Sequence, residues 1–324
     1  MAPLRVRVSG NRPLMARIVV LGASGFLGSH LCDELIARGD EVVGIDDLSS
    51  STGVNLKGLE SEKRFTFLRG DIAEGIPVRG KVDAVLNFAS PASPPRYLEI
   101  PIQTLRTGSQ GTDKALQFAL ENNARFIMAS TSEVYGDPVV SPQVETYWGN
   151  VNSIGERSCY DEAKRYAEAL CMAYWREYQA NIGIVRIFNT YGPRLDPSDG
   201  RVVSNFICQS IRGEDLTVYG DGSQTRSFCY VDDEIRGILA LLDSNERGPI
   251  NIGNPVEFTM MELSEIVLEL TGSQSKIVYR PLPEDDPMQR RPDITKARKL
   301  LGWEPTVDLR DGLMKTIDWF KKSL

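Results

Sequence analysis

One segment of this chain, Tyr-Asp-Glu-Ala-Lys, has residue types and a spacing that suit proton transfer. Tyr160 and Lys164 are four residues apart, so a helix would place them one above the other on one face. A tyrosine hydroxyl, with an ordinary pKa of ~10, is a poor base at neutral pH. We expect the Lys164 ammonium to lower this pKa by stabilising the phenolate. Shortly before this segment, Thr131 offers a hydroxyl for the same substrate oxygen, and Glu133 adds a carboxylate that simple alcohol oxidation does not require.

A Tyr/Lys pair of this kind also occurs on many surface helices, and it becomes informative only beside a cofactor site. Residues 17–21 are an apolar run typical of a buried parallel strand. They lead into the turn Gly22-Ala-Ser-Gly25-Phe-Leu-Gly28, a helical pattern at 29–38, and a second strand at 41–46 that ends in an acid. A dinucleotide fold requires this order, because the glycines let the backbone approach a diphosphate at the helix N-terminus.

Acidic residues that follow these strands indicate which dinucleotide is bound. Asp46, with Asp47 beside it, is expected to accept hydrogen bonds from the adenosine ribose hydroxyls. No Arg or Lys lies between Asp46 and Lys57, so a 2′-phosphate would meet repulsion, which favours NAD over NADP. Asp71, after a strand at 65–68, either reaches the adenine edge or forms a simple strand-end turn. The other residues that we assign to the cofactor site are Gly22, Gly25, Phe26, Leu27, Ile72, Ser90 and Thr107.

Strand and helix patterns alternate through the first half of the chain, which predicts an α/β protein with a doubly wound parallel sheet (Rossmann). Further strands are expected at 82–89, 125–130 and 182–188, and helices at 104–122 and 160–178. We expect residues 1–16 to be a disordered extension and 17–188 to form the dinucleotide-binding domain. Residues 189–324 are expected to form mainly a smaller α/β substrate domain at the C-terminal edge of the sheet, with some segments returning to the first domain.

Composition narrows the class of protein further. The 324 residues carry a net charge of −7, which argues against a nucleic-acid or anionic-membrane partner. Five cysteines without ligand spacing predict reduced thiols in a cytoplasm. The single histidine, His30, has no neighbours that suit a metal site or a catalytic triad, so no metal is expected. No apolar run approaches the ~20 residues that a membrane-spanning helix needs.

Two arginines in the second half of the chain lie in expected loops, Arg226 in a glycine-rich context and Arg290 in a proline-rich one. Their planar, bidentate donors suit diphosphate and carboxylate groups. Taken singly, each could equally be a solvated surface residue. The sequence pattern therefore leaves the role of both arginines open.

From about Arg17 to its C-terminus, the chain resembles the extended short-chain dehydrogenase/reductases that act on nucleotide sugars, and within them the UDP-glucuronate decarboxylases. Several motifs carry the resemblance together. They are Ser-Pro-Ala-Ser-Pro (90–94), Thr-Ser-Glu-Val-Tyr-Gly-Asp-Pro (131–138), Tyr-Trp-Gly-Asn-Val-Asn (147–152), Asn-Thr-Tyr-Gly-Pro-Arg (189–194), Gly-Arg-Val-Val-Ser-Asn (200–205), Gln-Thr-Arg-Ser-Phe (224–228) and Asp-Asp-Pro-x-x-Arg-x-Pro-Asp-Ile (285–294). The chain departs from the usual motifs at Asn87, where a histidine is common, and at Ala163, which replaces a glycine.

The resemblance implies conversion of UDP-glucuronate to UDP-xylose and CO2 by transient C4 oxidation with tightly bound NAD. It implies a homodimer packed through the helices at 104–122 and 160–178. The catalytic residues that it implies are Tyr160 as base, Lys164 as its partner and nicotinamide-ribose anchor, Thr131 as hydroxyl partner, and Glu133 and Arg290 as decarboxylase-type residues. For the substrate, it implies that Asn189 and Arg226 contact the UDP diphosphate and that Tyr219 lies near the uracil. It also implies a substrate contact for Arg106, at a position where a lysine is frequent. Thr190 and Arg201 are implied to lie near the cofactor.

Two other reactions use the same Tyr/Lys pair and NAD, and a third alternative is a protein that binds a dinucleotide without catalysis. A 4,6-dehydratase typically carries Asp-Glu where this chain has Ser132-Glu133. A UDP-glucuronate 4-epimerase has no need for Glu133, but whether CO2 is retained depends on a carboxylate orientation that sequence does not show. A dinucleotide-binding regulator without chemistry would usually have lost the Tyr/Lys pair. The decarboxylase is therefore favoured, with the epimerase as the main alternative.

Overall fold

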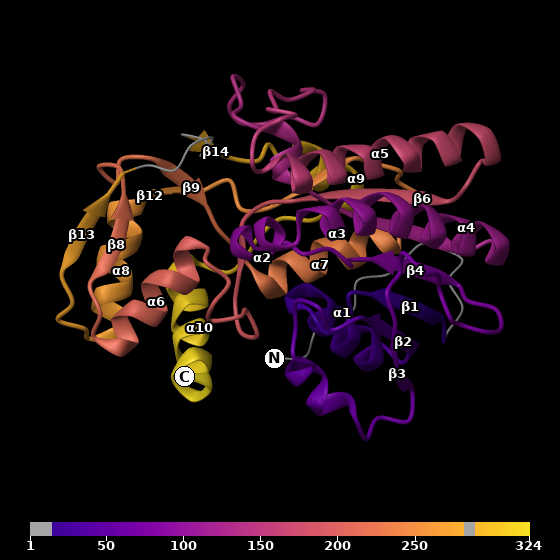
Figure 1. The fold of residues 1–324 in the computed structure, drawn as a ribbon, viewed down its shortest axis with the longest axis horizontal. Helices are drawn as coiled ribbons and strands as arrows, with labels where there is room; N and C mark the ends of the chain where they lie inside the picture. The colour runs from indigo at the N-terminus through magenta and orange to yellow at the C-terminus, as the bar shows by residue number, and fades with distance from the viewer. Residues whose placement is uncertain (1–14, 282–288) are drawn as a thin grey trace.

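A parallel sheet of seven strands forms the centre of the computed structural model, which describes residues 15–281 and 289–324 (Figure 1). In spatial order the strands are β11 (Ile250–Ile252), β6 (Ile182–Ile187), β5 (Arg125–Thr131), β4 (Ala84–Asn87), β1 (Arg17–Leu21), β2 (Glu41–Asp46) and β3 (Phe65–Arg69). All six neighbouring pairs are parallel. Side chains from alternate positions of β1 enter separate cores on the two faces of the sheet. This arrangement confirms the predicted doubly wound sheet.

Helices cover both faces of this sheet. One face packs against α1 (Phe26–Ala37), α7 (Val231–Leu242) and α9 (Thr295–Leu301). The other packs against α4 (Thr112–Asn122) and α5 (Ser158–Tyr178). Because the strands are parallel, the loops at their carboxyl ends meet at one edge of the sheet, which is where α/β proteins bind ligands.

A second region stands beside this edge, on the left in Figure 1. It contains a two-stranded sheet, β13-β8, a three-stranded sheet, β12-β9-β14, and three helices. Their bounds are β8 (Leu216–Tyr219), β9 (Thr225–Ser227), β12 (Glu257–Thr259), β13 (Ile277–Arg280), β14 (Gln289–Arg290), α6 (Val202–Arg212), α8 (Met260–Thr271) and α10 (Leu309–Ser323). A small pair of strands, β7 (Thr190–Tyr191) and β10 (Cys229–Tyr230), links it to the sheet region. We propose a domain boundary at 188/189, with β11, α7 and α9 returning to the first domain.

Short elements complete the described chain. They are η1 (Val54–Leu59), α2 (Pro94–Glu99), α3 (Pro101–Arg106), η2 (Thr107–Gly111) and η3 (Ser132–Tyr135). The helix expected at 104–122 thus begins earlier, at Pro101, and passes through one turn of π-helix at η2 before α4. At this turn the backbone approaches α5 closely: a Cβ on Gly108 would lie 2.6 Å from the Cβ of Ala163.

The expected N-terminal extension ends before residue 16. Ala16 is buried, and its backbone N–H donates to Asp40 Oδ1 at 3.1 Å, which ties it to the sheet. Residues 1–14 lie outside the described residues, as does the 285–288 part of the last motif. No helix within 15–281 or 289–324 is both long enough and apolar enough to cross a bilayer.

Candidate active site

The glycine turn between β1 and α1 is packed so closely that only glycine fits at two of its positions. Gly22 has a φ of +77°, and a Cβ there would lie 2.7 Å from the backbone of Phe88 and Ala89. A Cβ on Gly28 would lie 2.0 Å from the carbonyl oxygen of Gly22. This packing brings the N-terminus of α1 to the edge of a cavity, so its backbone N–H groups and helix dipole can meet an anionic ligand.

Two cavities meet at this turn, one of about 540 Å³ and one of about 60 Å³. Both are lined by Gly22, Gly25, Phe88 and Ser90, so they form one elongated site. The smaller cavity holds the expected adenosine residues, which are Asp46, Asp47, Asp71, Ile72 and Thr107. All but one of the remaining expected residues line the larger cavity. These residues are Phe26, Leu27, Thr131, Glu133, Tyr160, Lys164, Asn189, Thr190, Arg201, Tyr219, Arg226 and Arg290.

The exception is Arg106. It lies on the exposed side of α3, while its neighbour Thr107 is buried and lines the smaller cavity. Successive residues of a helix point about 100° apart, so these two cannot both face the site. The structure therefore does not bring Arg106 to the expected substrate contact.

The acids of the smaller cavity already make local contacts. Asp46 accepts backbone N–H groups of Ser24 and Leu48, both at 2.9 Å, which fixes its carboxylate against the glycine turn. Asp47 accepts the N–H of Ser49 at 2.9 Å, and Asp71 accepts that of Ala73 at 2.8 Å. Each carboxylate has further lone pairs, so these contacts fix the acids and leave them able to accept hydrogen bonds from a ligand.

Tyr160 and Lys164 lie one turn apart on α5, at the inner end of the larger cavity. The Lys164 Nζ donates to the carbonyl oxygen of Ala129 at 2.8 Å and lies 5.7 Å from the centre of the Tyr160 ring. The ring of Tyr97, from α2, is stacked on that of Tyr160, with 5.1 Å between centres and 8° between planes. These contacts fix the base candidate between two helices, with the hydroxyl of Thr131 as its hydrogen-bond partner.

Burial dominates the ionisation of this pair. It raises the pKa of Tyr160 to about 12, although the hydrogen bond with Thr131 acts in the lowering direction. It also lowers the pKa of Lys164 to about 8. Both shifts arise because a buried charge loses its hydration. In the protein by itself burial therefore keeps the pKa of Tyr160 above its ordinary value. The lowering that we expect from Lys164 stays a prediction.

Glu133 lies in the same cavity and is held by two arginines. Its Oε1 accepts a hydrogen bond from Nη1 of Arg290, and its Oε2 lies 2.9 Å from Nη2 of Arg157. Burial alone would raise the pKa of Glu133, but the two guanidinium groups lower it. The carboxylate is therefore ionised at neutral pH, and its partner Arg290 comes from a point 157 residues away in the chain.

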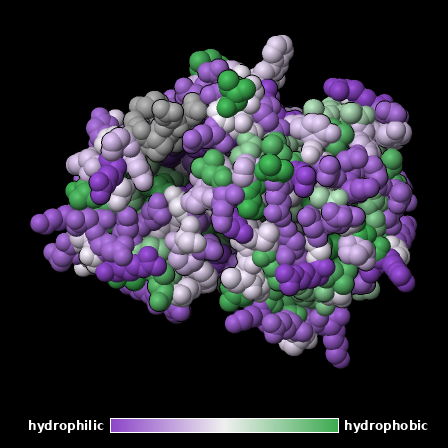
Figure 2. All heavy atoms as spheres, in the orientation of Figure 1, coloured by the Kyte–Doolittle hydropathy of each residue, from purple (hydrophilic) through white to green (hydrophobic). Residues whose placement is uncertain are grey.

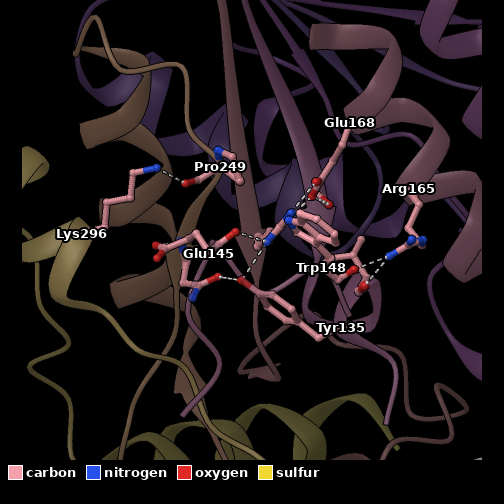
Figure 3. A network of polar contacts seen from close by, with 11 residues as sticks. Tyr135, Glu145, Trp148, Arg165, Glu168, Pro249 and Lys296 are labelled. Carbon is pink, nitrogen blue, oxygen red and sulfur yellow. Dashed lines mark hydrogen bonds and ion pairs between the residues drawn. The ribbon is translucent and has the colours of Figure 1, made fainter. Parts of the chain in front are cut away.

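A buried polar network holds the end of β5, which carries Thr131, and the following η3, which carries Glu133 (Figure 3). Glu168, one turn beyond Lys164 on α5, accepts a hydrogen bond from Ser130 Oγ at 2.5 Å and pairs with Arg186 at 2.7 Å. Arg186 also donates to the hydroxyl of Tyr135 at 2.9 Å. The network ties β5, η3 and β6 to α5, so Thr131 and Glu133 keep their place relative to Tyr160.

Sequence reasoning missed Arg157, which pairs with Glu133 in this cavity, and Tyr97, which stacks on Tyr160. Arg157 lies three residues before Tyr160, a spacing that places both on one side of a helix start, so this signal was available. Tyr97 follows Pro-Pro-Arg at the start of α2, and nothing in that pattern indicates that its ring stacks on a residue 63 positions later. Among the described residues, no group of His, Cys, Asp and Glu could hold a metal ion.

The fold and this site define a class of protein. A family model described as the NAD dependent epimerase/dehydratase family matches residues 18–253, and the chain belongs to this family.

Among curated proteins, the chain is 51% identical over 308 residues to UDP-glucuronic acid decarboxylase 1 of Arabidopsis thaliana, covering 95% of this chain and 70% of that protein. It is 48% identical to UDP-glucuronic acid decarboxylase 1 of Danio rerio, covering 95% and 73%. Among solved structures, it is similar to UDP-glucuronic acid 4-epimerase from Bacillus cereus in complex with UDP-glucuronic acid and NAD. That match has a TM-score of 0.85 and 31% identity, and covers 95% of this chain and 100% of the other.

Proposed function

We propose that this chain is a UDP-glucuronate decarboxylase that forms UDP-xylose and CO2 with bound NAD. The observation that carries the proposal is the ion-paired Glu133, held by Arg290 and Arg157 in the cavity that also contains Tyr160 and Thr131. Oxidation and return of a hydride do not require this cluster. The relatives at about half identity over most of the chain carry the same activity in their names.

NAD fits the residues that line the site. The glycine turn leaves no room for a Cβ at Gly22 or Gly28, and Asp46 and Asp47 line the cavity expected to take the adenosine. When bound, NAD supplies a hydride acceptor at C4 of the sugar and a positive charge. We propose Lys164 as the anchor of its nicotinamide ribose, and Thr190 and Arg201 as further cofactor contacts, because all three line the larger cavity.

Tyr160, as the phenolate, takes the proton of the C4 hydroxyl as C4 becomes a ketone. This ketone is β to the C6 carboxylate, so the electron pair of the C5–C6 bond can move onto O4 when CO2 leaves. The hydroxyls of Thr131 and Tyr160 then stabilise the enolate oxygen by hydrogen bonds. The Lys164 ammonium adds positive charge in a buried site, where its effect on the phenolate is stronger than in water.

C5 of the enolate must next receive a proton, and we assign this step to Glu133 with Arg290. Because Glu133 is itself ionised, the proton comes from a water molecule that Glu133 and Arg290 hold, and solvent neutralises the hydroxide that this water leaves behind. Return of hydride to C4 and of a proton from Tyr160 to O4 completes the turnover. Asn189, Arg226 and Tyr219 line the far part of the cavity, and we propose that they hold the diphosphate and the uracil.

Incubation with UDP-glucuronate and mass analysis of the product tests the function. Loss of the mass of one CO2 supports the decarboxylase. A product of unchanged mass with inverted C4 would replace it with the 4-epimerase, which the solved structure of a UDP-glucuronic acid 4-epimerase keeps as the second candidate. A 4,6-dehydratase would remove water instead, and Ser132 stands where that reaction typically has an acid.

We also propose a homodimer packed through α3, α4 and α5. Apolar side chains are exposed on this side, and Figure 2 shows such side chains near the centre of the face where α2, α3 and the start of α5 lie. They include Leu98, Ile102, Leu105 and Tyr166, of which Ile102 is 66% exposed. Light scattering should give twice the chain mass, and Ile102→Lys should shift the protein toward the monomer.

All five cysteines are buried free thiols, which supports the proposal that the protein works in the cytoplasm. The compartment can be checked by fractionation of the cells that produce the protein. Recovery of the enzyme from an oxidising compartment would contradict this proposal and leave the proposed reaction untouched.

A further inference from the structure

The ion pair between Arg290 and Glu133 joins the second region to the sheet region, so it depends on how the backbone around Arg290 is held. β14 pairs with β9 in parallel, with Arg290 opposite Arg226, and the hydroxyl of Ser227 donates to the carbonyl oxygen of Arg290 at 3.2 Å. These contacts hold the strand from the second region. Contacts with the sheet region are also needed to fix its position relative to η3, which carries Glu133.

Gln143, in the loop that follows η3, supplies such contacts. It is fully buried, and its backbone N–H donates to the carbonyl oxygen of Arg291 at 2.8 Å. Its side chain binds the same residue, because Oε1 accepts the backbone N–H of Arg291 at 2.7 Å. Its Nε2 donates to the carbonyl oxygen of Val140 at 2.8 Å, and its backbone carbonyl accepts the N–H of Asp293 at 2.9 Å. Gln143 therefore binds both backbone groups of the residue that follows Arg290.

Asn251, in β11, connects these contacts to the short helix that carries Glu133. Its side-chain nitrogen donates to the carbonyl oxygens of Gln143 and Asp293, at 2.9 and 3.1 Å. Its side-chain oxygen accepts the hydroxyl of Tyr135 at 2.7 Å. Tyr135 and Glu133 both belong to η3, so the ion pair closes a ring of buried contacts. Displacement of one member of such a ring breaks hydrogen bonds of the others.

We propose that Gln143 is a positioning residue that holds the guanidinium of Arg290 on Glu133, an inference that rests on the proposed decarboxylation. Gln143 is not among the described residues that line the two cavities, so it acts through the backbone that it binds. Its amide has one acceptor and donors, as a peptide group has, and so extends the contact between the loop and the chain after β14. Without this amide, the Arg290 segment keeps β9 and loses part of its attachment to the sheet region.

Displacement of Arg290 should affect protonation of C5 more than oxidation of C4. Tyr160 and Lys164 lie on α5, and the Lys164 Nζ is bound to β5, so the proton transfer at the C4 hydroxyl does not depend on β14. The water that Glu133 and Arg290 hold supplies the proton to C5, and hydride can return only after C4 is a ketone again. Slow protonation therefore leaves reduced nicotinamide bound during turnover.

Gln143→Met tests the proposal, because it keeps the length of the side chain and removes both amide contacts. The kcat for CO2 release from UDP-glucuronate should fall about tenfold, since a small displacement of a positioned group is enough for such a loss. Reduced nicotinamide bound during turnover, followed by its absorbance, should rise. The affinity for UDP, measured by calorimetry, should stay unchanged, since β9 keeps its own partners. A fall in kcat without this rise would overturn the proposal.

Gln274→Met is the matched control. It makes the same change at an exposed glutamine between α8 and β13, and it should keep the wild-type kcat. A similar fall in this control would overturn the proposal, as would a wild-type kcat in Gln143→Met.

A double variant separates positioning from a general structural role. In Arg290→Met the guanidinium is already absent, so addition of Gln143→Met should leave kcat unchanged. A merely structural Gln143 would cause the same loss in both backgrounds, and that result would overturn the proposal. If Arg290→Met does not fold, Glu133→Gln serves as the background, because it also removes the ion pair.

Gln143→Asn is the second variant, used if Gln143→Met does not fold. It keeps an amide, but its oxygen is one carbon short of the Arg291 N–H, so the same fall in kcat is expected and a wild-type kcat would overturn the proposal. Failure of the wild type to release CO2 would overturn the proposed function. Normal CO2 release by the wild type, together with any of the contrary results above, would overturn only the role of Gln143.

Discussion

Two ends of one cavity show how the same burial gives opposite ionisation states. At the phenol end, formed by Tyr160, Lys164 and Thr131, burial prevails, and the pKa values of both titratable groups shift toward the neutral forms. At the carboxylate end, formed by Glu133, Arg157 and Arg290, two guanidinium groups outweigh burial and the acid stays charged. The difference is the number of directly paired opposite charges: two arginines contact Glu133, whereas Lys164 donates to a backbone carbonyl.

This contrast matches what the proposed reaction asks of each end. Tyr160 must accept a proton and return it within one turnover. Neither the phenol nor the phenolate should therefore be strongly favoured once NAD and the substrate are bound. The carboxylate end orients a proton toward carbon, so a fixed ion pair suits it. Four experiments test this difference between the two ends.

Removal of the phenol should have the largest effect. Tyr160→Phe keeps the ring stacked on Tyr97 and deletes only the proton acceptor, so CO2 release from UDP-glucuronate should fall about a thousandfold. Tyr279→Phe, on β13 outside the proposed dimer face and 57% exposed, is the control and should keep full activity. Unchanged CO2 release in Tyr160→Phe would remove the phenol end from the chemistry.

Neutralising the carboxylate should have the next largest effect. Glu133→Gln should lower kcat about a hundredfold while bound NAD, measured in the purified protein, stays constant. Loss of this negative charge should also lower the pKa of Tyr160, which Glu133 raises, so the residual activity should reach its maximum at lower pH. Glu156→Gln, at another carboxylate of the cavity lining, should behave as the wild type. Full activity in Glu133→Gln would favour the epimerase.

Titration of Lys164 should give a smaller effect at alkaline pH. Burial lowers its pKa to about 8, so the ammonium is charged below that pH and lost as pH rises through it. The phenol end then loses its cation, and kcat should fall about tenfold per pH unit above that point. The fall is measured in the wild type as pH rises through that value. Lys164→Arg should abolish the fall, since guanidinium does not titrate there; a fall that persists would be due to another group.

The smallest expected effect is on stability. The hydroxyl of Tyr97 is buried and has no hydrogen-bond partner among the residues that the structure describes. Tyr97→Phe removes this uncompensated group and keeps the ring, so the free energy of unfolding should rise by up to about 1 kcal/mol. Denaturant unfolding measures the change, with Tyr279→Phe as the exposed control. A clear loss of stability would show that the hydroxyl is paired after all.

Local patterns were sufficient for much of this protein. The sequence predicted β1, the glycine turn, α1 and β2 because each depends on residues within one turn or one strand of its neighbours. Tyr160 and Lys164 also follow from spacing on a single helix. The boundary errors have local physical causes: Pro101 suits the first turn of a helix, so the helix begins before residue 104, and the buried Ala16 belongs to the sheet edge.

The state of the active site was decided by contacts between distant parts of the chain. Arg290 reaches Glu133 across 157 positions, and Tyr97 from α2 covers the ring of Tyr160. Burial, which shifts the pKa values of Tyr160 and Lys164, exists only after distant parts of the chain pack around the cavity. Sequence therefore determined which chemical groups are present and which elements carry them. Tertiary structure decided which of these groups are charged, because ionisation depends on the water and the charges that packing removes or brings near.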